Sequence, residues 1–184
     1  MKKSIQPKDY GFVVFADEQT YTEGTFASGV ATMYAYSEDD LGGLSLNHLT
    51  GVLKIGVTGS AKVVLAQISN ANRKPIAGAF DFDFEKGEAT ATASSKELIE
   101  YSFGEGLQLT SEAQYIHVAV PAGIYDELYI TLYEKGNSGN VMYATVKAPS
   151  TKPLTAGNVR EFSSSIVYAP NAQVFVINSV EKLK

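Results

Sequence analysis

Residues 53–57 read Leu-Lys-Ile-Gly-Val, and residues 80–85 read Phe-Asp-Phe-Asp-Phe-Glu. In both stretches an apolar side chain occupies every second position, which is the pattern of a β-strand with one buried face and one solvated face. A shift of one residue in the second stretch would bury its acids, so its pairing register is strongly specified. The two stretches therefore predict strands of an antiparallel sheet.

The chain from residue 44 onward repeats this pattern in short segments. Gly, Pro, Asn and Ser residues interrupt it about every eight to twelve positions, as in proteins built from many short strands. The predicted fold is all-β: an antiparallel, two-sheet, Greek-key β-sandwich of the transthyretin or immunoglobulin type. At most one short helix is expected, at residues 155–163, where Gly157 and a run of serines disfavour it.

Turn residues separate most of the predicted strands. The clearest hairpin is expected around residues 136–139, where Gly-Asn-Ser-Gly joins two alternating segments. Residues 88–95 read EATATASS, a small and polar composition that favours an exposed connection over a core strand. The predicted strands are 12–15, 29–36, 44–58, 62–69, 75–84, 97–103, 114–120, 127–133, 141–147 and 159–168.

Three segments are expected along the chain. Residues 1–28 hold one apolar run followed by a polar stretch, and are predicted to be an N-terminal segment with one strand, the remnant of a preceding domain. Residues 29–170 form the predicted sandwich domain. Residues 171–184 are predicted to be a tail that begins a following module. The chain is therefore expected to be either a truncated part of a longer protein or a reduced relative of one.

The composition disfavours several classes of partner and chemistry. The formal net charge of the 184 residues is −5 and the basic residues are scattered, so no nucleic acid partner is expected. The absence of Cys removes disulfides, thiolate metal sites and the acceptor for a lipid anchor. The sequence shows no transmembrane segment and, after Met1, no apolar run long enough for a signal peptide.

Short motifs at strand ends and turns follow one another in a fixed order. They are MYAYS at 33–37, LNHLTGVLKIGV at 46–57, IAG at 76–78, LQL at 107–109, VAVPAG at 118–123 followed by Tyr125, and LTAG at 154–157. This ordered set resembles the fimbrillin-like surface proteins of Gram-negative gut and oral bacteria. The resemblance implies a Greek-key sandwich that is exported as a lipoprotein and polymerises by donating a strand to a neighbouring subunit.

The resemblance also implies a location on the bacterial cell surface or in a fimbrium. The chain departs from the family pattern because it contains neither a signal peptide nor a lipid-accepting Cys. The segment Phe12, Val13, Val14 and Phe15 is the candidate for an exchanged strand, since alternate side chains of an added strand fill pockets in the core of its partner.

A second candidate site is a group of tyrosines. Tyr129 and Tyr133 alternate with aliphatic residues, so both are expected on the outer face of one strand, and Tyr143 on the neighbouring strand would join them. Flat aromatic rings on a sheet can stack on the C–H faces of sugars, while their hydroxyl groups form hydrogen bonds. The tyrosines therefore indicate a possible ligand surface for glycans.

No catalytic, cofactor or metal site is expected. His48 and His117 lack the surrounding residues of a catalytic triad or a metal site, and His117 is predicted to be a solvated strand residue. The acids at 38–40 are adjacent, which favours a solvated turn over a cation site. The acids at 81–85 would suit a glycoside hydrolase, but their alternation with Phe explains them as the wet side of a strand.

The predicted function is a non-enzymatic structural or adhesive component of the bacterial cell surface. Its expected partners are other fimbrial subunits, bound by strand exchange, or a glycan or protein on a host or microbial surface. The alternative is a glycan-binding β-sandwich module of a surface protein. No cofactor is expected for either function.

Overall fold

The structure is a computed structural model that describes residues 10–35, 45–134, 141–147 and 153–166. The described residues form strands and turns, without a helix. The strands are β1 (Tyr10–Phe15), β2 (Glu18–Thr20), β3 (Met33–Tyr34), β4 (Asn47–His48), β5 (Thr50–Val57), β6 (Lys62–Asn70), β7 (Ala77–Asp83), β8 (Glu88–Lys96), β9 (Leu98–Gln108), β10 (Gln114–Pro121), β11 (Glu127–Glu134), β12 (Val141–Lys147) and β13 (Val159–Ile166).

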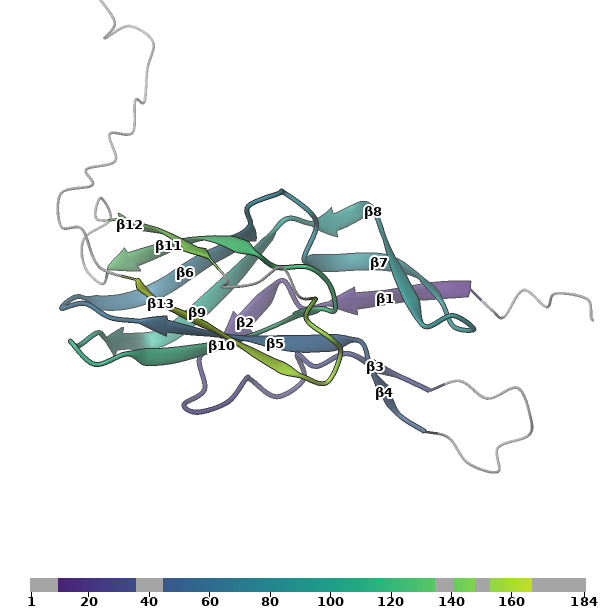
Figure 1. The fold of residues 1–184 in the computed structure, drawn as a ribbon, viewed down its shortest axis with the longest axis horizontal. Coiled ribbons are helices and arrows are strands. Elements are labelled where there is room, and N and C mark those ends of the chain that lie inside the picture. The colour runs from purple at the N-terminus through teal and green to yellow at the C-terminus, as the bar shows by residue number, and fades with distance from the viewer. Residues whose placement is uncertain (1–9, 36–44, 135–140, 148–152, 167–184) are drawn as a thin grey trace, which may run out of the picture.

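Two of the sheets form a β-sandwich (Figure 1). The larger sheet has the strand order β12-β11-β6-β9-β2, and the smaller has the order β10-β5-β13. Most neighbouring strands are antiparallel, but β13 runs parallel to β5 and β2 runs parallel to β9. The prediction of an all-β sandwich is therefore confirmed.

The main hydrophobic core lies between the inner faces of these two sheets. Leu53, Ile55 and Val57 of β5 are each no more than 1% exposed, and Lys54 between them is half-buried. The buried side chains of the core come from both layers and include Ile68, Ile99, Tyr101, Ile116, Val118, Leu128, Ile130, Leu132 and Phe162. The apolar side chains at alternate positions of β5 therefore lie in the core, as predicted.

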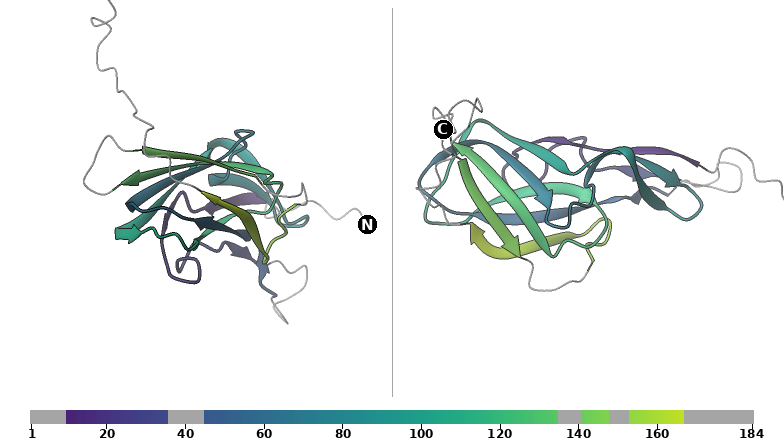
Figure 2. Two further views of the ribbon diagram at one scale, coloured as in Figure 1. Left: turned by 60° about the vertical axis from the view of Figure 1, so that its left-hand side comes forward. Right: turned by 90° about the horizontal axis from the view of Figure 1, so that it is seen from above.

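A smaller unit, which we call the extension, continues one end of the sandwich (Figures 1 and 2). It consists of the antiparallel sheet β1-β7-β8 and the two-stranded sheet β3-β4. Tyr10 of β1 pairs with Asp83 of β7, and Phe15 pairs with Gly78. A second, separate core is built from the buried side chains of Phe15, Leu49, Phe80 and Phe82.

Two of the predicted strand boundaries are wrong. The strand expected at 29–36 is only β3 in the described residues, because the chain turns at Gly29 with a φ of 84°, a left-handed conformation that favours glycine. The connection expected at 88–95 is a strand, β8, which pairs with β7 and is mostly exposed. An edge strand needs backbone partners more than it needs apolar side chains, so its polar composition was misleading.

The other predictions concern turns, a short helix and the division of the chain into segments. The turn at 136–139 lies outside the described residues, but the strands on either side of it pair as a hairpin, with Tyr133 opposite Val141. The residues at 155–163 form a turn and the beginning of β13. β2 lies in the polar stretch of residues 1–28, a segment in which only one strand is predicted. The division at residue 28 stays a prediction, although β1 and β2 on its N-terminal side pair with β7 and β9.

Candidate functional site

The predicted exchanged strand is an edge strand with two different faces. All residues of β1 pair with β7 on one side, and within the described ranges no strand pairs with the other side. Phe15 is 1% exposed and packs edge-on against Phe80, with 5.0 Å between ring centroids. Phe12 and Val14 are 72% and 53% exposed. β1 therefore anchors one face in the extension and presents an apolar face to solvent.

The segment that follows β1 is tied to β8 of the extension and to β10 of the smaller sheet. Asp17 forms an ion pair with Lys96, whose hydrogen bond lowers the pKa of the Asp17 carboxyl. The buried side chain of Gln19 donates from Nε2 to the carbonyl of Ala119 at 2.7 Å and accepts at Oε1 from the Ala119 N–H at 3.0 Å. The amide of Gln19 thus takes the place of a backbone partner at the free edge of β10.

The structure places two of the predicted tyrosines on the outer face of the larger sheet. Tyr129 is 48% exposed, while its neighbours Leu128 and Ile130 are buried. Tyr133 is half-buried, and its hydroxyl donates to Oε1 of Gln67 at 2.8 Å. Along a strand, residues four positions apart are separated by about 13 Å, so the two rings are separate platforms rather than one stacked pair.

The third tyrosine is only partly described. Tyr143 lies on β12, where it pairs with Thr131, the residue between Tyr129 and Tyr133 on β11. The backbone register therefore sets it beside the other two tyrosines, as predicted, but the side chains of β12 lie outside the description. The glycan surface consequently rests on Tyr129 and Tyr133.

The prediction that His117 is a solvated strand residue is wrong. His117 is 9% exposed, and its Nδ1 has no hydrogen-bond partner among the described residues. His117 is covered by residues that are far away in the sequence. The segment after β2, with Tyr21 and Glu23, lies against this part of β10 and lines the same hollow as His117. Burial, and then the nearby Lys54 ammonium, lower the pKa of the His117 imidazole.

Lys54 belongs to a chain of polar contacts across the smaller sheet. Its Nζ lies 2.9 Å from Oε2 of Glu161 and 4.0 Å from the centroid of the Tyr115 ring. Tyr115 extends over β5, where a Cβ at Gly56 would stand 3.4 Å from its ring. Gly56 is therefore buried by Tyr115, contrary to the prediction that it shares a solvated face with Lys54.

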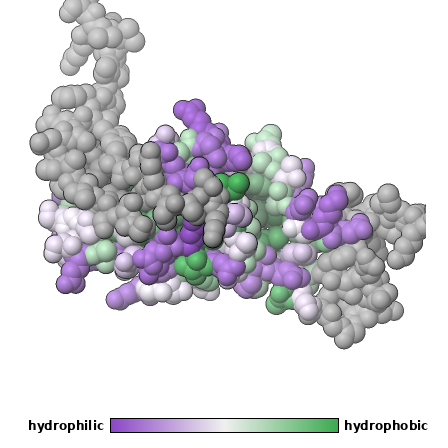
Figure 3. All heavy atoms as spheres, in the orientation of Figure 1, coloured by the Kyte–Doolittle hydropathy of each residue, from purple (hydrophilic) through white to green (hydrophobic). Residues whose placement is uncertain are grey.

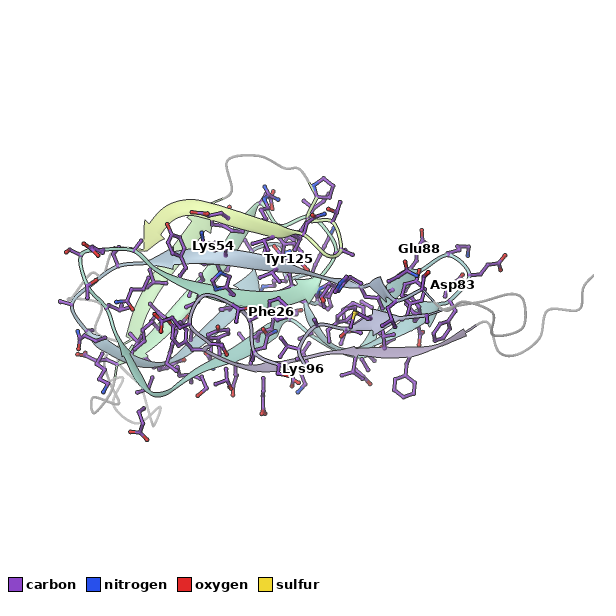
Figure 4. The ribbon with its side chains drawn as sticks, turned by 90° about the horizontal axis from the view of Figure 1, so that it is seen from below. Phe26, Lys54, Asp83, Glu88, Lys96 and Tyr125 are labelled. Carbon is purple, nitrogen blue, oxygen red and sulfur yellow. The ribbon has the colours of Figure 1, made fainter. Side chains whose placement is uncertain are left out.

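The acids at 81–85 lie on β7 and in the turn that follows it. Asp81 is exposed, and β7 ends at Asp83. Oδ1 of Asp83 accepts hydrogen bonds from the N–H groups of Glu85 and Lys86, and Oδ2 lies 2.7 Å from Nζ of Lys86. Asp83 therefore closes the turn between β7 and β8, and Figure 4 shows it near Glu88 in the extension.

The remaining predicted polar sites are not brought together. The acids at 38–40 lie outside the described residues, and His48 is an exposed residue of β4. In the part of the chain that the structure describes, no group of three His, Cys, Asp or Glu side chains is arranged to hold a metal ion.

A hollow of about 510 Å³ lies where the sandwich meets the extension. Phe15 and Phe80 contribute apolar surface to it, and Asn70, which is 2% exposed, also lines it. Nδ2 of Asn70 donates to the carbonyl of Ile124 at 3.3 Å, whereas its Oδ1 has no partner among the described residues. The lining of this hollow also includes the charged residues Lys74 and Glu88.

The surface drawn in Figure 3 is mostly hydrophilic, with hydrophobic residues in small separate patches. Within the described ranges, the structure also has no helix that is long and apolar enough to cross a membrane.

Comparison with known proteins shows a similarity of fold to a solved structure. No family model and no curated protein matches the sequence. Among solved structures, the chain is similar to the crystal structure of a "putative cell adhesion protein" from Bacteroides uniformis ATCC 8492, with a TM-score of 0.50 and 14% sequence identity. The match covers 94% of this chain and 65% of that chain, so this chain spans about 65% of its neighbour's length.

These observations define the class of protein. The chain is an all-β sandwich protein with a small β extension, and its fold as a whole is similar to that of the Bacteroides protein. At this level of identity the likeness concerns the fold alone.

Proposed function

We propose that this protein is a structural or adhesive component of the bacterial cell surface, related to fimbrial subunits, and that it acts without catalysis. The observation that carries the proposal is the similarity of fold, over 94% of the chain, to a protein named "putative cell adhesion protein". The ordered motifs that resemble fimbrillin-like proteins support the same function. The Greek-key, transthyretin-like arrangement of the sandwich is part of this proposal.

The proposed mechanism of assembly is strand exchange through β1. A strand from a neighbouring subunit can add to a sheet edge through main-chain hydrogen bonds, with alternate side chains filling pockets of the core. β1 has both properties, because it pairs with β7 over its full length and inserts Phe15 between residues of the second core. A copy of β1 from another chain would make the same contacts with β7.

The test is removal of β1 followed by its return as a peptide. We expect deletion of residues 1–16 to lower the melting temperature and to abolish self-association measured by analytical ultracentrifugation. A peptide of residues 8–17 should bind the deleted protein and restore its melting temperature, and a peptide that carries Phe15→Asp should not. The mechanism is wrong if the deletion leaves both stability and self-association unchanged.

A glycan-binding module is the second candidate. It is supported by the exposed ring of Tyr129 and by Tyr133 on the same outer face. We expect glycan-array signals of the wild-type protein to be lost in a variant with Tyr129→Ala and Tyr133→Ala. Tyr133→Phe is the matched control, because it removes only the hydrogen bond to Gln67. An array without signal for the wild-type protein removes this candidate.

A further inference from the structure

A segment that we call the strap, residues 21–31, lies against the outer face of the smaller sheet. Figure 1 shows it as a loop below β10. Tyr21 and Glu23 of the strap line a hollow together with His117 of β10. The strap therefore covers part of the face that carries His117.

The two ends of the strap are anchored. The N–H of Tyr21 donates to the carbonyl of Ser102 at 2.8 Å, and the Tyr21 ring packs against Phe103 with 5.8 Å between ring centroids. At the other end, the side chain of Val30 is 7% exposed. If the strap lifts from its first end, the hydrogen bond between Tyr21 and Ser102 must break.

The middle of the strap is held loosely. Between the two anchors, the hydrogen bond that the structure describes is internal to the strap, from the N–H of Thr25 to the carbonyl of Thr22 at 3.3 Å. Residues 22–25 are exposed, and the backbone turns at Gly24 with a φ of 74°. Segments with few buried apolar contacts open locally at a low cost in free energy. The strap is thus a segment that can lift while the sandwich stays folded.

His117 lies in surroundings that suit a neutral side chain. It is 9% exposed, and its Nδ1 has no hydrogen-bond partner among the described residues. In the register of β10 and β5, His117 stands directly opposite Lys54. The tyrosines at this place, Tyr115 beside the Lys54 ammonium and Tyr101 at the His117 carbonyl, are neutral groups. A protonated imidazole needs an acceptor for each N–H group and would face the like charge of Lys54, so proton uptake is costly while the strap is closed.

The nearby carboxylates are engaged elsewhere. Glu161 lies beyond Lys54 on β13, and its Oε2 is 2.9 Å from the Lys54 ammonium. Glu23 on the strap is exposed and acts on the hydroxyl of Tyr21, whose pKa is raised by burial and then by this negative charge. Among the charged groups around His117, Lys54 therefore acts on it most directly.

We propose that the strap is a pH-sensitive switch, in which proton uptake by His117 opens the strap below neutral pH. When the strap lifts, water reaches this face of β10 and solvates the imidazolium, so the open form binds a proton more readily than the closed form. Burial, and then the Lys54 ammonium, lower the pKa of the His117 imidazole in the closed form below its ordinary value of about 6.5. The stability of the closed form is therefore complete above about pH 6.5 and is lost as the pH falls toward the lower pKa.

The test follows the amide of Tyr21 in the full chain by NMR hydrogen exchange between pH 7 and pH 4.5. Its protection, corrected for the intrinsic pH dependence of exchange, reports the opening of the strap because this N–H is bonded to Ser102. We expect the opening constant to rise by up to about tenfold for each pH unit below about 6.5, until the closed-form pKa is reached. The amide of Ala71, bonded to the carbonyl of Glu127 at 3.0 Å, is the internal reference and should show no such rise.

Three variants separate the switch from a general effect of acid. His117→Leu should abolish the rise, so that the protection of Tyr21 at pH 5 equals its protection at pH 7. Lys54→Met removes the like charge and should make the rise smaller, because His117 in the closed form then titrates closer to its ordinary range. His48→Gln removes the other histidine of the chain, at an exposed position of β4, and should leave the rise unchanged.

The proposal is overturned if the protection of Tyr21 in the wild-type protein does not change over this pH range, or if the rise persists in His117→Leu. The Cε1–H resonance of His117 gives an independent reading that needs no variant: its titration without any loss of Tyr21 protection also overturns the proposal. The switch goes beyond the proposed structural function. None of these results depends on self-association through β1, so failure here is distinct from failure of the proposed function.

Discussion

At the scale of single residues, Gln19 links parts of the chain that are far apart in sequence. Its side-chain amide replaces a peptide group at the edge of β10 by pairing with both backbone groups of Ala119. An unpaired buried N–H and C=O would otherwise remain at this edge, where no strand pairs with β10 in the described residues. The side chain of Gln19 thus links β2 of the larger sheet to β10 of the smaller sheet.

Replacement of this amide should be costly. Gln19→Ala removes three hydrogen bonds, one to Ala16 and two to Ala119, and leaves the backbone groups of Ala119 buried without partners. We therefore expect the free energy of unfolding to fall by about 2–3 kcal/mol. Urea denaturation measures this change. The control is Gln67→Ala, in a half-buried position on the outer face of β6, which should cost less than about 1 kcal/mol. Equal effects of the two substitutions would contradict the role of Gln19.

The ion pair between Asp17 and Lys96 should make stability depend on acidic pH. The hydrogen bond from Lys96 lowers the pKa of Asp17 in the folded protein, so its contribution to stability is complete above the unfolded pKa of about 3.9. That contribution is lost as the pH falls through the lower, folded pKa. We expect the free energy of unfolding to decrease less steeply below about pH 4 in Asp17→Asn than in the wild type.

Lys96→Met tests the same ion pair by removing its positively charged partner. It should flatten the same part of the pH profile, and the double variant should resemble either single variant, since both remove one interaction. A pH profile of Asp17→Asn that parallels the wild-type profile would contradict the role of this ion pair.

The buried histidine shows why part of the site could not be predicted. The alternation of Ile116, His117 and Val118 correctly places His117 on the outer face of β10, but the sequence pattern does not reveal which faces are covered. The segment that covers it is nearly 100 positions away, and it contains no regular alternation of its own. A similar distance separates Gln19 from Ala119.

At the scale of elements, β7 and β8 show how an irregular hairpin is held together. The pairing register shifts between Gly78 and Phe80. At this point the hydroxyl groups of Thr92 and Ser95 both donate to the carbonyl of Ala79, at 3.0 and 2.7 Å. The small polar residues of β8 therefore replace backbone hydrogen bonds that the irregular register disrupts.

A side chain at Gly78 should break this arrangement. Gly78 has a φ of 81°, and a Cβ there would stand 2.6 Å from the backbone oxygen of Ser94. We expect Gly78→Ala to lower the free energy of unfolding by more than about 2 kcal/mol, because backbone strain and a backbone collision add. Gly104 has a φ of 58° and open space around it, so Gly104→Ala should cost only about 1 kcal/mol. Thermal denaturation of both variants compares the two costs, and similar values would contradict the collision at Gly78.

Strands with strict alternation were predicted well, and irregular ones were not. The predicted segments 62–69 and 127–133 correspond closely to β6 and β11, because their buried residues, such as Ala66, Ile68, Leu128, Ile130 and Leu132, all belong to one core. The two residues of β3 and the exposed strand β8 depend on pairing partners rather than on their own composition. That dependence on tertiary context is why β8 was mistaken for a connection.

At the scale of the whole molecule, the two cores differ greatly in size. The core of the sandwich draws buried side chains from both of its sheets, whereas the second core has four buried residues among those described. The stability of a unit against local opening rises with the apolar surface that it buries. The extension should therefore open more readily than the sandwich, which would also make β1 available for exchange.

Native-state hydrogen exchange can test this difference directly. We expect amides of β7 that pair with β1 to exchange through an opening that costs several kcal/mol less than the opening of β5 amides that pair with β10, because only the small core must separate. Phe15→Ala should speed exchange in β7 further and leave β5 nearly unchanged, while Phe12→Ala, at an exposed position of the same strand, should alter neither. If the β7 and β5 amides show the same free energy of opening, the sandwich and the extension unfold as one unit, and β1 cannot be released without unfolding the whole protein.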